Sequence, residues 1–358
     1  MNDVTDIRAT IAKVVEGENL DADEMVGAMR QIMSGACGDA QIGGLLVALR
    51  CKGETVDEIA AAAQVMRELA SGVRCSTTNL LDIVGTGGDS HSTFNISTTS
   101  ALVAAAAGIK VAKHGNRAVS SSSGAADLLE AAGVNINLEA EQVARCVDTV
   151  GLGFMFAPKH HGAMRYAIGP RKELGMRTIF NVLGPLTNPA SAPRQVLGVY
   201  SKHLVEPMAQ VLQKLGSEGA MVVHAEDGMD EISIASATSV AELKDGRINC
   251  YSVQPSDFDM ERADLAALKV STANESLAMV QRVLSNEAGP ARDIVALNAG
   301  AAIYVGGLAD DHQQGVKMAS ELIANGSARQ KLQDLIDCSN ASATDVADDT
   351  ATPQRPVN

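Results

Sequence analysis

The sequence has no tryptophan, and aromatic residues make up only 3% of its 358 residues. Proteins that bind single-stranded nucleic acid stack bases on aromatic side chains, so this scarcity argues against that class. The formal net charge of −14 argues in the same direction, because surfaces that bind nucleic acid or anionic membranes are positively charged. We therefore expect neither nucleic acid nor a membrane as a partner.

Cysteine is sparse and scattered, and no CxxC pair occurs. This usage is typical of reduced, mostly structural thiols in a cytoplasmic protein. No uncharged apolar run reaches the roughly 18 residues that cross a bilayer. The first residues, MNDVTDIRAT, lack the basic and apolar regions of a secretory signal. These absences predict a cytoplasmic location. The cysteines are Cys37, Cys51, Cys75, Cys146, Cys250 and Cys338.

The order of the sequence patterns predicts the fold. Residues 5–72 carry helical patterns, with capping boxes at Asp21 and Glu24 and at Thr55 and Glu58. From residue 80 onward, short apolar runs alternate with helical patterns, which predicts a mostly parallel sheet covered by helices. A hairpin should turn at the Asp-Gly pair of residues 245–246. Strands are expected at 80–84, 109–112, 134–136, 154–156, 196–200 and 220–224.

We therefore expect an α/β protein in which a small, all-helical N-terminal domain precedes a larger α/β domain with a mostly parallel central sheet. The domains should cover residues 1–72 and 73–338. The polar residues 339–358 should form a disordered tail.

Two loops rich in glycine and small hydroxyl side chains stand out in this pattern. GTGGD at 85–89 precedes a helical run, and KHGNR at 113–117 leads into four serines. Such loops present backbone N–H groups to anions, and a helix start adds partial positive charge. Two of them indicate a phosphorylated metabolite with two anionic ends. Neither loop has the GxGxxG or GxxxxGK[ST] spacing. The alternative interpretations are a tight turn, an N-cap at Ser97, a flexible serine loop and a structural histidine at His114.

Basic and polar residues are concentrated in the part of the sequence that contains and follows the second loop. Residues 110–177 hold nine Lys and Arg against six Asp and Glu, which suits a discrete anion site in an acidic protein. Lys113 and Arg117 supply charge at its start. The adjacent His160 and His161 suit zinc poorly, whereas with Arg171 they suit a pocket for a carboxylate.

Two further segments carry defined patterns. RTIFNVLGPLTNP at 177–189 is rigidified by proline, either as a pocket lip, as an interdomain hinge or as a plain connector. Asp230 and Glu231 follow a predicted strand, at the edge where α/β sheets bind ligands. A carboxylate pair beside a diphosphate would hold Mg²⁺, and the alternative is a solvated acidic turn.

In this order the segments GTGGD, FNIST, KHGNR, RTIFNVLGPLTNP and DEIS resemble those of the anthranilate phosphoribosyltransferases, from the N-terminus to about residue 335. The resemblance implies the two-domain fold shared with nucleoside phosphorylases and a homodimer formed through the helical domains. It also implies transfer of the phosphoribosyl group from 5-phosphoribosyl 1-diphosphate (PRPP) to the amine of anthranilate, with Mg²⁺, in tryptophan biosynthesis. Whether an anthranilate synthase subunit associates is not determined by it.

The resemblance also implies roles for individual residues. PRPP is expected to contact Gly85, Gly88, Asp89, Thr93, Asn95, Ile96, Ser97, Thr98, Lys113, Asn116, Ser120 and Ser121. Anthranilate is expected at Gly85, Asn116, His161 and Arg171, with Gly184 and Pro185 shaping its access. Mg²⁺ is expected at Ser97, Asp230 and Glu231. No residue is expected to act as acid, base or nucleophile, because the acceptor amine is already neutral.

The chain departs from the family pattern at Ser122, where many relatives carry lysine, at Ala125, where many carry serine, and at Gly162, where proline is frequent. Two other functions remain as alternatives. A pyrimidine nucleoside phosphorylase has a similar glycine loop, but the segments FNVLGPLTNP and DEIS argue against it. A nucleic-acid-binding relative without activity is disfavoured by the Asp230–Glu231 pair and the net charge.

Overall fold

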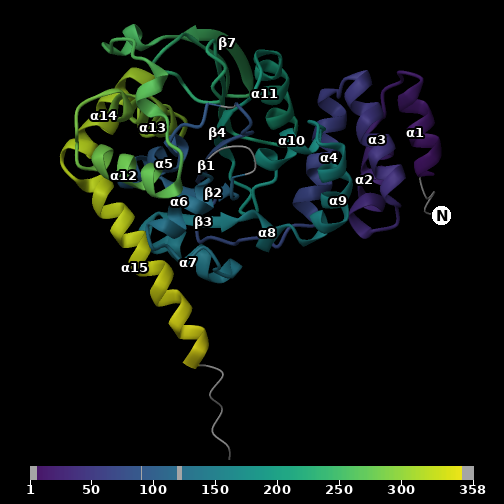
Figure 1. Cartoon of the computed structure of the whole chain (residues 1–358), viewed down its shortest axis with the longest axis horizontal. Coiled ribbons are helices and arrows are strands. Elements are labelled where there is room, and N and C mark those ends of the chain that lie inside the picture. The colour runs from purple at the N-terminus through teal and green to yellow at the C-terminus, as the bar shows by residue number, and fades with distance from the viewer. Residues whose placement is uncertain (1–5, 90, 119–122, 349–358) are drawn as a thin grey trace, which may run out of the picture.

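The computed structural model describes residues 6–89, 91–118 and 123–348. A helical lobe lies beside a larger domain built on one seven-stranded sheet (Figure 1). The predicted α/β architecture, with a small helical domain and a mostly parallel sheet, is confirmed.

The helical lobe begins with four helices whose ends are fixed by local chemistry. Both predicted capping boxes are present: the Asp21 side chain accepts from Glu24 N, and the Thr55 side chain accepts from Glu58 N. The lobe is not made by the first residues alone, because α9 from the middle of the chain packs against α2 and α3. The helices are α1 (Ile7–Val15), α2 (Ala22–Ser34), α3 (Asp39–Lys52), α4 (Val56–Glu68) and α9 (Arg165–Leu174).

The sheet has the strand order β3-β2-β1-β4-β5-β6-β7. The first five strands of this order are parallel, and β6 and β7 pair antiparallel. The expected hairpin turns at Asp245 and Gly246, both with positive φ. The strands are β1 (Leu80–Gly85), β2 (Lys110–Gly115), β3 (Leu152–Phe156), β4 (Arg194–Gly198), β5 (Gly219–Ala225), β6 (Thr238–Lys244) and β7 (Arg247–Val253).

Alternate residues of the strands face two separate hydrophobic cores. On β5, Met221 and Val223 join the core formed with α5, α13 and α15, while Ala220 and Val222 join the core that continues through α11 into the helical lobe. The remaining α-helices are α5 (Ile96–Ala106), α6 (Ala125–Ala131), α7 (Ala140–Val150), α8 (Ala157–His160), α10 (Phe180–Leu183), α11 (Val205–Lys214), α12 (Ala273–Leu284), α13 (Pro290–Val305), α14 (His312–Ala324) and α15 (Ser327–Asp348). Short 3-10 helices are Gly162–Met164, Gly184–Leu186, Lys202–Leu204, Pro255–Phe258 and Leu265–Leu268.

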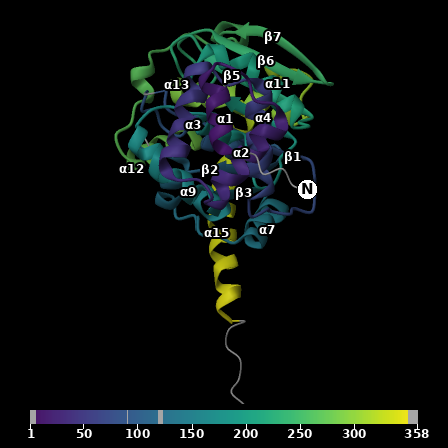
Figure 2. The same ribbon diagram turned by 90° about the vertical axis from the view of Figure 1, so that its right-hand side faces the viewer.

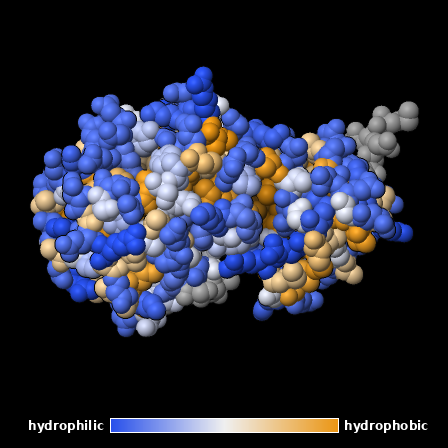
Figure 3. All heavy atoms as spheres, turned by 90° about the horizontal axis from the view of Figure 1, so that it is seen from above, coloured by the Kyte–Doolittle hydropathy of each residue, from blue (hydrophilic) through white to orange (hydrophobic). Residues whose placement is uncertain are grey.

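The view turned by 90° places the lobe in front of the sheet domain, with α15 leading away from it (Figure 2). Most of the surface seen from above is hydrophilic, and hydrophobic atoms gather where the molecule narrows toward the lobe (Figure 3). Within the described ranges, none of the helices is both long enough and apolar enough to span a bilayer.

Two sequence predictions are wrong. Residues 134–136 form no strand, and α15 continues past Ser339, where disorder was expected. The two errors share a cause: the Ser339 hydroxyl accepts from Asn135 N at 3.1 Å, and Asn340 Nδ2 donates to Gly133 O at 2.9 Å. Polar side chains that were expected in a disordered tail therefore form hydrogen bonds with the backbone of a loop far away in the sequence. Residues 349–358 lie outside the described residues.

Candidate active site

The candidate site lies at the carboxyl ends of the parallel strands β1, β2, β4 and β5. GTGGD and KHGNR begin in the last residues of β1 and β2, and the segment after β5 carries the Asp230–Glu231 pair. Because parallel strands end at the same edge of the sheet, segments far apart in sequence meet there.

The glycine loop wraps around one carboxylate. Gly87 N donates to Asp230 Oδ2 at 2.7 Å. A Cβ atom on Gly85 would collide with the same carboxylate, and one on Gly198 would collide with the Asp230 backbone. Gly87 and Gly88 both have positive φ, which glycine adopts without strain. Glycine at these positions therefore allows the loop and Asp230 to approach each other closely.

Asp230 is buried, Asp89 and Glu231 are half-buried, and the three carboxylates repel one another. Burial, followed by the charge of Asp89, raises the pKa of Asp230 to about 7. Burial and the Asp230 charge raise the pKa of Glu231 well above its usual value, opposed by Lys113 and by a hydrogen bond from Ser97 N. When both carboxyl groups are ionised, the site therefore carries more negative charge than Lys113 compensates.

This donor set fits a hard divalent cation, which prefers carboxylate oxygens. Across the described ranges, no group of three or more His, Cys, Asp or Glu side chains forms a ready metal cage. Mg²⁺ is usually held by one or two carboxylates together with water and substrate phosphates, so Asp230 and Glu231 suit it. Ser97 lies beside the pair, since its backbone N–H donates to Glu231, and its Oγ accepts from Lys113 Nζ at 3.4 Å.

Lys113 is the cation that faces this site from β2. It is buried, and its Nζ donates to Ile83 O at 2.5 Å. Burial lowers its pKa, and the nearby charges of Asp82 and Glu231 oppose that shift. Arg117, expected to supply further charge, instead pairs with Asp127 and Glu130 at 3.0 and 2.8 Å.

The start of α5 holds several predicted phosphate contacts, and most are engaged by the protein. Asn95 Oδ1 accepts from the hydroxyls of Ser123 and Ser276 at 3.0 and 2.8 Å. The Ile96 side chain is buried, and Thr93 forms an isolated bridge with Lys269. Thr98 Oγ1 is buried without a hydrogen-bond partner. The structure therefore brings Asn95 to the site as a brace between α5, α12 and the second loop.

Two histidines form the wall beside Lys113. The rings of His114 and His161 lie 5.0 Å apart, and both Nε2 atoms are buried without a partner. Burial lowers the pKa of His161 to about 4 and that of His114 to about 3, so both rings are neutral at pH 7. Hydrogen bonds to the backbone of Gly184 and Thr187 place the 177–189 segment over them. His160 has a structural role, since its Nδ1 lies 2.9 Å from Ser71 O.

The other predicted acceptor residues are more loosely placed. The Arg171 guanidinium lies 5.1 Å from the centre of the Phe180 ring, and burial lowers its pKa. Asn116 is exposed, and its Oδ1 accepts from Arg117 N at 2.7 Å. Within the described part of the chain, the ring contact of Arg171 is with Phe180 and not with His114 or His161. A Cβ on Gly162 would meet open space, so the departure from proline leaves no gap in packing. Ala125 begins α6, while Ser120, Ser121 and Ser122 lie outside the described residues.

Sequence reasoning missed two groups that shape the site. Arg177 donates to Gly88 O and stacks 4.0 Å from the Tyr200 ring centre, so it clamps the glycine loop. Asp82 is fully buried and accepts from Asn188 Nδ2 at 2.7 Å and His114 N at 3.2 Å. A carboxylate within the apolar run LLDIV was a signal for the second group. Nothing in the sequence indicated the clamp.

Comparison with known proteins assigns this arrangement to a class. A model of the glycosyl transferase family, a/b domain, matches residues 77–329, and one of the glycosyl transferase family, helical bundle domain, matches residues 8–70. The chain therefore belongs to this glycosyl transferase family, whose two parts correspond to the sheet domain and the helical lobe.

Within that family, the curated relatives narrow the assignment. The anthranilate phosphoribosyltransferases of Thioalkalivibrio sulfidiphilus and Methylococcus capsulatus are 59% and 58% identical to it, over 92% of this chain and 98% and 97% of theirs. The chain belongs to the anthranilate phosphoribosyltransferases.

Solved structures agree with that assignment. The anthranilate phosphoribosyltransferase of Thermus thermophilus superimposes with a TM-score of 0.88 at 44% identity, covering 92% of this chain and 99% of that one. The Saccharomyces cerevisiae enzyme in complex with PRPP and Mg has a TM-score of 0.86 at 28% identity, covering 94% and 98%.

Proposed function

We propose that the protein transfers the 5-phosphoribosyl group of PRPP to the amine of anthranilate, as a step of tryptophan biosynthesis. The observation that carries this proposal is the Asp230–Glu231 pair, buried at Asp230 and half-buried at Glu231, beside the GTGGD loop. The pair needs a cation, and the loop supplies N–H groups for phosphate. The family membership supports the identity of both substrates, and complexes of the yeast enzyme contain PRPP with Mg or 4-fluoroanthranilate.

The donor would lie along the glycine loop with its diphosphate toward the carboxylates. We assign it to Gly85, Gly88, Asp89, Thr93, Asn95, Ile96, Ser97, Thr98, Lys113, Asn116, Ser120 and Ser121, with Mg²⁺ at Ser97, Asp230 and Glu231. The ion, when bound, neutralises the diphosphate. The Thr98 hydroxyl, buried and without a partner, and the Lys113 ammonium supply donors for phosphate oxygens.

The acceptor would lie against the histidine wall. We assign anthranilate to Gly85, Asn116, His161 and Arg171. The neutral His114 and His161 rings have free Nε2 atoms that a ligand can satisfy, and arginine pairs with carboxylates through its planar fork. In the reaction, the amine lone pair forms the bond to ribose C1 while the C1–O bond breaks, and diphosphate leaves with that electron pair. The amine proton passes to solvent or diphosphate. The protein orients the two reactants and shields them from water, which accounts for much of such catalysis.

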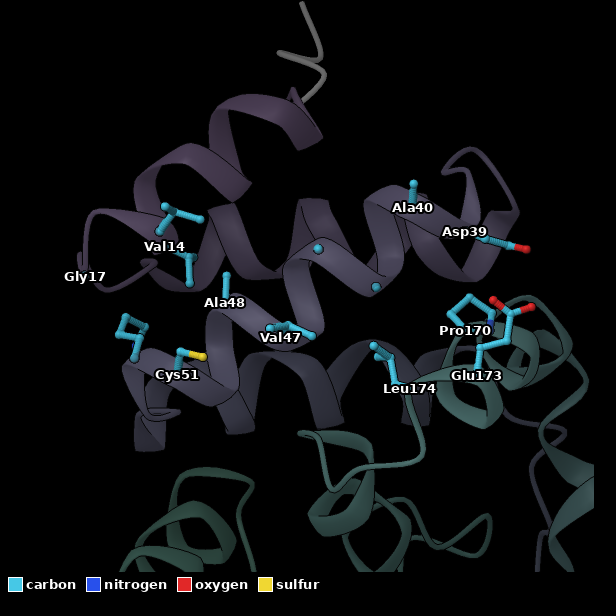
Figure 4. A pocket seen from close by; sticks show the side chains of 14 residues that line it. Val14, Gly17, Asp39, Ala40, Val47, Ala48, Cys51, Pro170, Glu173 and Leu174 are labelled. Carbon is cyan, nitrogen blue, oxygen red and sulfur yellow. The ribbon is translucent and has the colours of Figure 1, made fainter.

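A second copy of the chain would cover the outer face of the helical lobe. A groove of about 960 Å³ opens between α1, α3 and α9, and Val14, Val47, Ala48 and Leu174 line it (Figure 4). Val15 at its rim is 66% exposed, and Gly43 leaves space for a facing backbone. An apolar face of this kind favours association, so we assign a homodimer through the lobes. The protein would act in the cytoplasm, where its substrates are soluble metabolites.

The proposal is tested by following anthranilate fluorescence after PRPP is added, with and without Mg²⁺. We expect a decay that needs both substrates and the metal. A flat trace from folded protein would contradict the proposal. Inorganic phosphate with pyrimidine nucleosides would then test the phosphorylase alternative, and salt-sensitive retention on DNA would test the nucleic-acid-binding one.

A further inference from the structure

Two cysteines from distant parts of the chain meet on the flank of the α/β domain, away from the site described above. Cys146 on α7 and Cys338 on α15 are 192 positions apart in sequence, yet their Sγ atoms lie 3.3 Å apart. Cys146 is fully buried, whereas Cys338 is partly exposed. Cys338 is therefore the more solvent-exposed residue of the pair, and its Sγ lies next to that of the buried Cys146.

The surrounding contacts hold the two sulfurs in this position. Lys331 on α15 donates to Val150 O at the end of α7, at 2.8 Å. Two turns further along α15, Cys338 Sγ lies 3.6 Å from Thr149 Oγ1, and Ser339 Oγ accepts from Asn135 N at 3.1 Å. The helices are thus fixed on both sides of the pair. The sulfurs need to approach only about 1.2 Å further to reach the length of a disulfide bond.

We propose that Cys146 and Cys338 form a thiol pair that a small-molecule disulfide, such as glutathione disulfide, converts into an intramolecular disulfide bond. The accessible Cys338 thiolate attacks the oxidant, forms a mixed disulfide and releases one glutathione thiolate. The Cys146 thiolate then attacks the Cys338 sulfur and releases the second. The protein loses two electrons and two protons, and the oxidant is reduced to two thiols.

The cross-link would fasten the C-terminal helix to the sheet domain. A bond between residues so far apart restricts the unfolded chain strongly and stabilises the folded one. It would also fix the position of Leu335, which lies with Thr98 and Lys113 around a small internal space beneath the site. The inference itself rests on the two helices and does not depend on the proposed reaction.

The full-length protein tests the proposal after incubation with glutathione disulfide, unfolding and alkylation. We expect the alkylated thiols to fall from six to four, and a peptide joining Cys146 to Cys338 to appear by mass spectrometry. The melting temperature should rise by about 3–5 °C and return after reduction. Cys338→Ser should abolish both effects, and Cys338→Ala provides a second variant should the first fold poorly. Cys250→Ser, which removes an exposed thiol elsewhere, should preserve both.

Six alkylated thiols after oxidation would overturn the proposal. A glutathione adduct that persists on Cys338 would also overturn it, because the Cys146 sulfur would then be unable to attack. So would a cross-link that joins any other pair of cysteines.

Discussion

At the scale of single residues, the site brings together carboxyl groups whose ionisation destabilises the folded protein. Asp230 is buried and Glu231 is half-buried, and the pKa of each is raised by burial and by a neighbouring carboxylate. This arrangement weakens the ligand-free fold and strengthens cation binding, as is common at functional sites.

The Asp230 carboxyl gives a prediction for pH and stability. Its pKa of about 7 in the folded state lies above the roughly 3.9 of an unfolded chain, so the folded protein binds more protons between these values. The free energy of unfolding without ligands should therefore fall as pH rises from 4 to 7. Asp230→Asn should flatten that fall and stabilise the protein at pH 8 by on the order of 2 kcal/mol. Urea titrations from pH 4 to pH 8 measure both effects.

The same substitution should lower kcat/KM about 100-fold, because it removes the carboxylate that we propose holds Mg²⁺. Glu226→Gln, an exposed change near the same edge, is the matched control and should leave activity and pH dependence unchanged. Normal turnover of the Asp230→Asn variant at saturating Mg²⁺ would contradict the proposal that Asp230 binds the metal.

The close approach of Gly85 to Asp230 gives a second prediction. Gly85→Ala places a methyl group against the carboxylate and should reduce kcat/KM by at least 10-fold. Gly169→Ala, at an exposed position of α9, is the matched control, because a Cβ there meets nothing within 4 Å. Steady-state kinetics on both variants check this. Equal activity of the two variants would show that the loop moves away from Asp230 freely.

At the scale of elements, the connection between α9 and α10 holds the glycine loop in place. Arg177 in this connection binds Gly88 O and stacks on Tyr200, whose backbone N–H donates to Thr86 Oγ1 at 3.0 Å. The glycine loop is therefore held by a connection that starts from α9, a helix that packs in the helical lobe.

Loss of the clamp should weaken donor binding. Arg177→Met should raise KM for PRPP about 5-fold while kcat and KM for anthranilate stay within about 2-fold, because a hydrogen bond to a charged group contributes roughly 1 kcal/mol or more. Tyr200→Phe keeps the stacking ring and should behave as the unmodified protein. A rise in KM for anthranilate alone would place Arg177 on the acceptor side instead.

At the scale of the whole molecule, dimerisation should depend on the lobe face alone. Val15→Glu with Val47→Glu places two charges in the apolar groove and should convert a dimer into a monomer in light scattering after size exclusion. Leu308→Glu, which changes an exposed apolar residue of the α/β domain, should remain dimeric. A monomeric unmodified protein would contradict the assigned interface.

Much of the fold was predictable from sequence because its signals are local. The capping boxes at Asp21 and Thr55, the Asp-Gly hairpin and the alternation of strands with helices each depend on residues close together in the chain. The glycine loops and the Asp230–Glu231 pair were recognisable for the same reason, since their chemistry lies within a few residues.

Tertiary structure decided what depends on distant partners. Ser339 and Asn340 were expected in a disordered tail, but they form hydrogen bonds with the backbone of residues 133–135. Arg117 was expected to supply charge to the site, but it forms ion pairs with Asp127 and Glu130. Likewise, only folding brings Arg177 to Gly88 and Cys146 to Cys338. The sequence by itself determined most of the helices and strands and the reactive groups, because local conformation and residue chemistry suffice for these. Which groups remain free to bind a ligand was decided by long-range packing, since that choice depends on which distant atoms occupy each hydrogen bond.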